Sequence, residues 1–179
     1  IQITVDGVSR QVPAGTTGTE LFAEQHDVVA VKIEGVVRDL ATALHEGDEV
    51  EPATLSSQDG LNVLRHSTTH VLAQAVQRIR PDAKLGIGPF IENGFYYDFD
   101  VTDPFTPEDL KAITAEMRKI VKQGQRFVRR TVTEAQARTE EADQPYKLQL
   151  IDRKGHPDEG TGASVEVGGT ELTMYDNVD

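Results

Sequence analysis

The spacing of apolar residues changes at residue 61, and this change restricts the possible folds more than any other feature of the sequence. Before it, short runs such as "IQITVDGVSRQV" alternate apolar and polar residues, which is the period of a half-buried strand. After it, apolar residues recur at helical spacing until Pro81, which predicts a helix of about 20 residues. The turn-forming run "SSQDG" separates the two patterns. We therefore expect two domains, at residues 1–59 and 60–179.

The first domain is expected to be a small α+β fold. An Asp6-Gly7 step lies between two alternating runs and predicts a β-hairpin. Thr17 and Glu20 have the spacing of a capping box, which predicts the start of a short helix. Strand-like runs follow in "VVAVKIEG", "VVRDL" and "DEVEPAT". This order of elements predicts one helix lying across a mixed sheet.

The second domain is also expected to be α+β, with a further helix after the first long one. Thr106 is a good N-cap, Pro107 suits the first helical position, and Gly124 marks the end of that helix. Before it, "LGIGPFIENGFYYDFD" predicts loop and strand around an Asn93-Gly94 turn. After "RFVRRTV" we expect a short polar helix in "TEAQARTEEA" and strands in "YKLQLI" and "SVEVGG".

The composition excludes several kinds of site and location. The sequence contains no cysteine, which excludes disulfides, thiolate zinc sites and a cysteine nucleophile within it. It has no apolar run of about 18 residues, and its first residues do not resemble a secretion signal. We therefore expect a soluble cytoplasmic protein that does not associate with membranes.

The net charge of −12 argues against DNA or RNA binding by the chain as a whole, because phosphate contacts depend on Lys and Arg. The charge is uneven, however: residues 1–60 hold 3 basic and 11 acidic side chains, and residues 61–179 hold 15 and 19. A basic cluster in the second part is either a solvated helix end or a contact with an RNA backbone. It comprises Arg118, Lys119, Lys122, Arg126, Arg129 and Arg130.

Two histidines lie four residues apart in the long helix predicted after residue 61. At about 100° per residue, His66 and His70 share a face opposite the apolar side of that helix. They are therefore expected at the exposed surface or in the wall of a cleft covered by later segments. The spacing suits a chance surface pair, an acid/base cluster for hydrolysis, or two ligands of a metal ion. The Glu of a metalloprotease HExxH is missing, so that route to peptide hydrolysis lacks its general base.

Three segments, "RHSTTHVLAQAVQ", "PDAKLGIGPFIENGFYYDFD" and "QPYKLQLI", closely resemble the amino-terminal half of bacterial threonyl-tRNA synthetase. The preceding domain resembles the TGS domain of that family, a ubiquitin-like β-grasp module. The resemblance covers the chain from Ile1 to Asp179. It implies an α+β editing domain of the threonyl/alanyl-tRNA synthetase type from residue 60 onward. In the family, this domain hydrolyses serine that has been attached in error to threonine tRNA.

The resemblance also implies the roles of individual residues. His66 and His70 match the HxxxH pair of the editing site, and Lys147 matches an editing-site lysine. Tyr97 matches a substrate-binding tyrosine, and Asp179 an acidic residue just before the family's C-xxx-H element. A histidine would position or deprotonate the attacking water, and Lys147 would bind substrate or stabilise oxyanion charge. The alternatives are that Lys147 is a surface lysine at a strand edge and that Tyr97 is a packing residue.

The sequence departs from the family pattern at its end, because it stops before C-xxx-H. We therefore expect this chain alone to lack editing activity. We expect no cofactor here; ATP, Mg²⁺ and Zn²⁺ belong to the absent synthetic domain, and the homodimer contact to the absent core. The implied partners are tRNA(Thr) and mischarged seryl-tRNA(Thr). The alternatives are a non-catalytic module that docks the tRNA acceptor arm through the basic cluster, and a zinc-binding fold.

Overall fold

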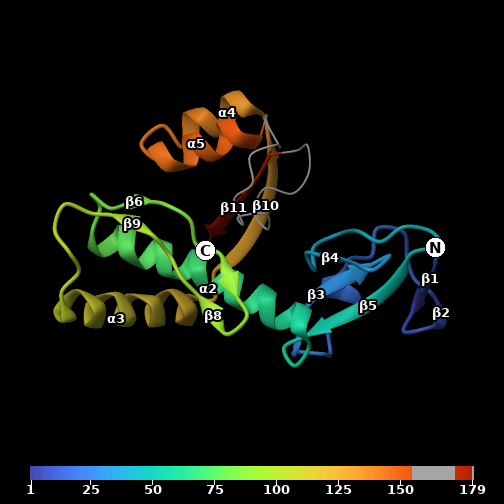
Figure 1. The fold of residues 1–179 in the computed structure, drawn as a ribbon. Helices are drawn as coiled ribbons and strands as arrows, with labels where there is room; N and C mark the ends of the chain where they lie inside the picture. Colours follow the sequence, from blue (N-terminus) through green and yellow to red (C-terminus); the bar gives the residue numbers. More distant parts are fainter. Residues whose placement is uncertain (155–171, 179) are drawn as a thin grey trace. The chain divides into compact units, whose positions relative to one another are not determined.

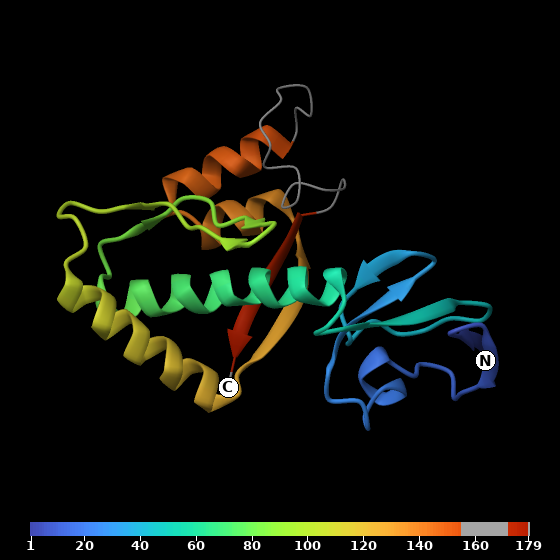
Figure 2. The same ribbon diagram turned by 60° about the horizontal axis from the view of Figure 1, so that its bottom comes forward.

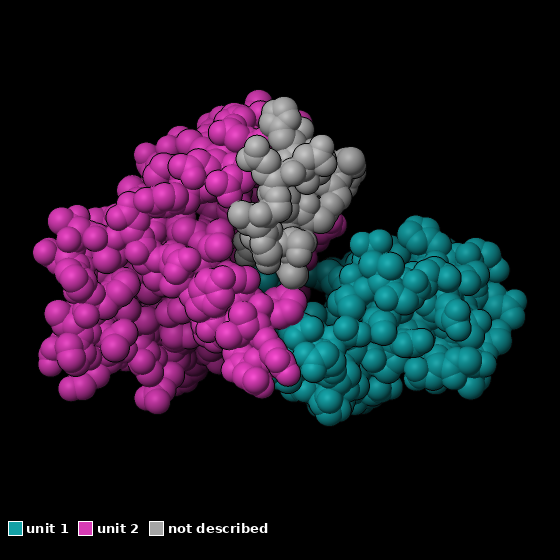
Figure 3. Space-filling model, viewed as in Figure 1, with its two compact units in different colours: residues 1–67 teal, residues 68–179 magenta. Residues whose placement is uncertain are grey.

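The computed structural model describes residues 1–154 and 172–178, which form a mixed α+β structure with five helices and eleven strands (Figure 1). The chain divides into two compact units, Ile1–Ser67 and Thr68–Asp179 (Figure 3). The division falls inside helix α2 (Gln58–Ile79), later than the boundary expected after residue 59. In the part of the chain that the structure describes, no helix is both long and apolar enough to cross a membrane.

The first unit is built on a five-stranded mixed sheet with the order β2-β1-β5-β3-β4. Strands β1 and β5 are parallel, and the other neighbours are antiparallel. The predicted hairpin at Asp6-Gly7 is confirmed: both residues have positive φ, 49° and 77°, and they join β1 to β2. The strands are β1 (Gln2–Val5), β2 (Val8–Gln11), β3 (Val28–Ile33), β4 (Val36–Arg38) and β5 (Glu49–Thr54).

A single short helix, α1 (Gly18–Leu21), packs on this sheet. Its predicted capping box is confirmed: the Thr17 side chain accepts a hydrogen bond from the Glu20 amide, and the Glu20 carboxylate accepts one from the Thr17 amide. Gly18 lies so close to β3 that an added Cβ would be 2.7 Å from Cγ1 of Val31. The core beneath the helix consists of Ile3, Val5, Phe22, Val28, Val31, Leu44 and Val50.

The core of the second unit lies between α2 and α3 (Pro107–Gln123), which run side by side (Figures 1 and 2). The predicted limits of α3 are confirmed, with Thr106 in a capping box and Gly124 in the left-handed conformation at φ 66°. An ion pair of 3.0 Å between Arg78 and Glu116 joins the two helices. The buried residues of this core are Ala75, Val76, Ala83, Ile113 and Ile120.

Two small antiparallel strand pairs lie between α2 and α3 in the sequence. Strand β6 (Lys84–Leu85) pairs with β9 (Phe99–Asp100), and β7 (Phe90–Ile91) pairs with β8 (Gly94–Phe95). Because Ile91 is opposite Gly94, Glu92 and Asn93 form the turn, one residue earlier than the sequence predicted. Gly94 instead begins β8, with φ at 150°.

The remaining elements are a two-stranded ribbon and two helices. The ribbon pairs β10 (Arg126–Val132) with β11 (Leu172–Val178) in antiparallel register. The predicted polar helix is confirmed as α4 (Glu134–Glu140). The strand predicted in "YKLQLI" is wrong, since these residues lie in helix α5 (Pro145–Lys154). Six alternating residues do not separate a strand from a helix, whereas Pro145 at the first helical position favours the helix. The strand expected in "SVEVGG" lies outside the described residues.

Gly60 lies where the start of α2 contacts β5, and replacing it tests that contact. Both the glycine and β5 belong to the first unit, which ends at residue 67. A Cβ atom at this position would lie 2.0 Å from the carbonyl oxygen of Thr54. Ala is usually favoured over Gly in a helix, but a clash with backbone outweighs that gain. We expect Gly60→Ala to lower the free energy of unfolding by about 1–3 kcal/mol in urea titrations. Asn62→Ala is the control, expected within about 0.5 kcal/mol; equal stability of the two variants would contradict this close contact.

Candidate active site

His70 on helix α2 lies against the β10–β11 ribbon. The centroid of its ring is 5.8 Å from that of Phe127 on β10 and 6.1 Å from that of Tyr175 on β11. The histidine is half-buried, so this face of the helix is covered by later segments of the chain. Of the two locations expected for His70, the covered one is therefore observed. His66, also half-buried, lies one helical turn earlier on α2.

An amide residue continues the same face one turn after His70. The side chain of Gln74 donates to Oε1 of Gln125 at 3.0 Å and accepts from Nδ2 of Asn177 at 2.6 Å. Gln125 lies directly before β10, and Asn177 lies on β11 opposite Phe127. Neither Gln74 nor its partners were singled out from the sequence. Helical spacing from His70 is the signal by which Gln74 could have been found.

Tyr97 and Lys147 come together between the β8–β9 segment and α5. The Lys147 ammonium is 6.0 Å from the centroid of the Tyr97 ring, a cation–π distance. The same ring stacks on Phe99 with centroids 4.6 Å apart. Its position also requires glycine at residue 88, since a Cβ there would lie 2.3 Å from Cδ2 of Tyr97. Because α5 is a helix, Lys147 is presented from a helix and not from a strand edge.

Glu141 is a half-buried carboxylate that lies within the electrostatic influence of Lys147. Burial raises the pKa of Glu141 above its ordinary value of 4.5, and the positive charge of Lys147 opposes the rise only in part. The residue caps the end of α4, where its amide donates to the carbonyl of Ala137. The sequence did not single it out, because its burial depends on how α4 and α5 fold together.

The residues of the basic cluster differ in whether they are already paired. Arg130 donates to Asp176 on β11, at 3.0 Å for one contact, and to Glu140 on α4 at 2.7 Å. These hydrogen bonds raise the pKa of Arg130, and they lower the pKa values of both carboxylates. Lys119 pairs with Glu116 at 2.9 Å. Among residues 1–154 and 172–178, no ion pair involves the other four members, Arg118, Lys122, Arg126 and Arg129.

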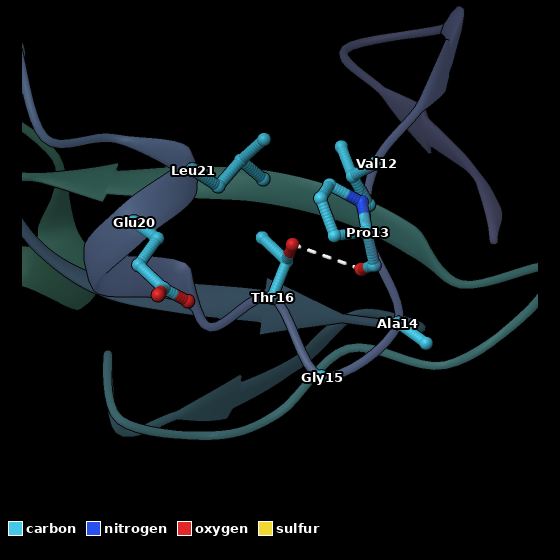
Figure 4. Close-up of a pocket in the computed structure, with 7 residues that line it drawn as sticks. All are labelled: Val12, Pro13, Ala14, Gly15, Thr16, Glu20 and Leu21. Atoms are coloured by element: carbon cyan, nitrogen blue, oxygen red, sulfur yellow. Dashed lines mark hydrogen bonds between the residues drawn. The ribbon is translucent and has the colours of Figure 1, made fainter.

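Neither His66 nor His70 lines either of two pockets found among the described residues. One, of about 430 Å³, is formed in the first unit by Val12–Thr16, Glu20 and Leu21 (Figure 4). Its one carboxylate, Glu20, is held by the capping box, and Thr16 donates to the Pro13 carbonyl. The second, of about 470 Å³, lies between the β6–β9 strand pair and α5. There the Tyr146 hydroxyl donates to Asp100 at 2.8 Å, and this hydrogen bond raises the pKa of Tyr146.

Within residues 1–154 and 172–178, no group of three or more His, Asp or Glu side chains is placed to hold a metal ion. Asp179, expected as an acidic member of the site, lies outside the described residues. The structure therefore places His66, His70, Tyr97 and Lys147, but not Asp179.

The protonation of Glu141 gives a pH-dependent prediction. Because its pKa is raised in the folded state, its contribution to stability is complete below pH 4.5 and is lost as pH rises through the raised value. We expect Glu141→Gln to be more stable than the parent near pH 7, with the difference disappearing below pH 4.5 in denaturant titrations. Lower stability of this variant at pH 7 would mean that attraction to Lys147 outweighs burial.

The neighbouring Glu140 supplies a control of opposite sign. Arg130 lowers the pKa of Glu140 below 4.5, so its contribution is present above pH 4.5 and is lost as pH falls through the lowered value. Glu140→Gln should therefore be less stable than the parent near pH 7, and the difference should shrink in acid.

The comparisons with known proteins agree with the sequence resemblance. No protein-family model matches the chain. It is 58% identical over 179 residues to threonine–tRNA ligase of Bifidobacterium animalis subsp. lactis, covering all of this chain and 26% of that protein. It is 57% identical to the ligases of Paenarthrobacter aurescens and Streptomyces avermitilis, over all of this chain and 27% of each relative. The chain is therefore, over its whole length, a homologue of part of the bacterial threonine–tRNA ligases, spanning about a quarter of the length of the relatives it matches.

Proposed function

We propose that this chain is the TGS and editing region of a threonyl-tRNA synthetase, and that residues 60–179 take part in hydrolysing seryl-tRNA(Thr). The observation that carries this proposal is the identity of 56–58% to threonine–tRNA ligases over the whole chain. The HxxxH pair, the FYY run and the PYK run all lie within the matched region. ATP-dependent ligation of threonine, with its Mg²⁺ and Zn²⁺, is assigned to the remainder of the parent enzyme. The homodimer contact is assigned to that remainder too, and the protein is placed in the cytoplasm.

The architecture of the first unit supports a TGS domain of the β-grasp type. A mixed five-stranded sheet carries one short helix, inserted between the first hairpin and β3. That helix closes the apolar core against the sheet through Phe22 and neighbouring residues. The order of elements in the sequence predicted one helix across a mixed sheet, and this arrangement supports the proposed β-grasp domain.

The proposed reaction is water attack on the ester that joins serine to the terminal ribose of the tRNA. A histidine of the pair His66 and His70 positions the water or accepts its proton as the new C–O bond forms. Lys147 binds substrate or stabilises negative charge on the carbonyl oxygen, and Tyr97 contacts the substrate beside it. The ester C–O bond then breaks, and the ribose oxygen leaves with a proton. Serine and free tRNA are the products.

Editing answers a physical limit on the selection of threonine. Serine keeps the hydroxyl of threonine and lacks only its methyl group, and a missing methyl is worth about 1–3 kcal/mol of discrimination. A synthetic site that accepts threonine therefore also accepts some serine. A second site that removes the smaller product lowers the error rate without weakening the first.

The decisive test uses a version of the chain extended past Asp179 through the rest of the editing domain. We expect this version to hydrolyse seryl-tRNA(Thr), and His66→Ala to slow hydrolysis by about 10²–10⁴-fold, the usual loss for a general base. His26→Ala, in an exposed loop of the first unit, is the matched control and should leave the rate unchanged. Hydrolysis by His66→Ala at the parent rate would remove His66 from the mechanism.

A second candidate function is a non-catalytic module that docks the tRNA acceptor arm. Four basic side chains that make no ion pair within residues 1–154 and 172–178 favour it, since no described carboxylate competes with phosphates for them: Arg118, Lys122, Arg126 and Arg129. Replacing all four with Ala should weaken tRNA binding and reduce the slope of log K against log salt by about 3–4. Filter binding at several salt concentrations measures this slope. If the chain only docks tRNA, both the 179-residue chain and the extended version should bind tRNA without cleaving the ester.

A further inference from the structure

We propose that Gln74 is a positioning residue for His70. It holds the β10–β11 ribbon against the histidine face of α2. The positioning of His70 by Gln74 does not depend on the proposed function. Only its effect on ester hydrolysis rests on that function. Its basis is a pair of side-chain hydrogen bonds, with Gln125 and Asn177, one helical turn after His70.

The two partners of Gln74 come from separate segments of the chain. Gln125 follows Gly124, whose left-handed conformation ends α3 and turns the chain into β10. Asn177 lies near the end of β11, and it is the register partner of Phe127. A single side chain thus joins α2 to strand β11 and to the residue that directly precedes β10. Such a bridge restrains the ribbon more than either hydrogen bond would alone, since β11 and the start of β10 are held by one side chain.

The spacing of the helix matches the spacing of the strand along this contact. His70 and Gln74 are four residues apart on α2, a rise of about 6 Å. Tyr175 and Asn177 are two residues apart on β11, a rise of about 6.8 Å, and their side chains share a face. The α2–β11 interface therefore contains two neighbouring contacts. His70 contacts Tyr175, and one turn later Gln74 contacts Asn177.

The chemistry of the three side chains suits positioning. Amides do not titrate near neutral pH, so their hydrogen bonds persist over the range in which a histidine gains or loses its proton. Oδ1 of Asn177 is buried without a hydrogen-bond partner among the described residues, so its Nδ2 bond to Gln74 is what compensates for burying that amide. If this bond were lost, water would compete for the Asn177 amide at the end of β11.

Nuclear magnetic resonance on the 179-residue chain tests the proposal without requiring catalysis. Gln74→Met keeps the length of the side chain and removes both hydrogen bonds. We expect the His70 ring protons to move, since they lie near the rings of Phe127 and Tyr175. We also expect hydrogen exchange of the β10–β11 amides to become about 2- to 12-fold faster for each hydrogen bond lost. Amides of α3 should not change, which separates a local effect from general destabilisation.

Two further variants make the test specific. Gln77→Met removes an amide from the same helix at a half-buried position outside this network, and it should leave His70 and the ribbon unchanged. Gln74→Glu keeps an oxygen that accepts from Asn177, and it should restore slow exchange in β11. Unmoved His70 resonances in Gln74→Met, or exchange no faster than in Gln77→Met, would overturn the proposal.

The extended, ester-hydrolysing version separates this inference from the proposed function. There Gln74→Met should lower kcat for seryl-tRNA hydrolysis more than it changes KM, because the substrate contacts at Tyr97 and Lys147 remain. If the extended parent does not hydrolyse the ester, the proposed function fails. The resonance and exchange measurements still decide whether Gln74 positions His70.

Discussion

The contact between helix α2 and the segments on its two sides is the interaction on which the second unit depends. One face of α2 contributes Ala75 and Val76 to the core shared with α3. The opposite face carries His70 and Gln74, and the β10–β11 ribbon covers it. A helix that is apolar on one side and polar on the other usually leaves its polar side to water. Here that side is closed by aromatic rings and amides, which gives a half-buried histidine without placing it in the apolar core.

The ribbon is in turn held from its other face. Side chains alternate along β10, so Phe127 points toward α2 while Arg130 points away from it. Arg130 pairs with Asp176 across the ribbon and with Glu140 on α4. A two-stranded ribbon is marginal by itself, and contacts on both faces are what make it a stable support. This use of Arg130 also distinguishes it from Arg118, Arg126 and Arg129, which form no ion pair in the described part of the chain.

Local sequence signals predicted many of the elements correctly. The hairpin at Asp6-Gly7 and the capping boxes at Thr17 and Thr106 depend on residues close in sequence, so their geometry follows from residue type. The helix α5 was missed because six alternating residues suit either period, and the contacts of α5 with β6 and α4 are not visible in the sequence. The turn after Ile91 was misplaced by one residue, since pairing with Phe95 and Gly94 sets the register.

For the site, the sequence by itself determined that His66 and His70 share a helix face away from the apolar side, because helical spacing alone fixes that direction. Resemblance then supplied their proposed chemistry, together with that of Tyr97 and Lys147. Only the tertiary structure decided that His70 lies against Phe127 and Tyr175, that Lys147 lies near the Tyr97 ring, and that Gln74 bonds β11 and the residue before β10. These contacts join residues far apart in the sequence, and no local periodicity encodes which distant segments meet.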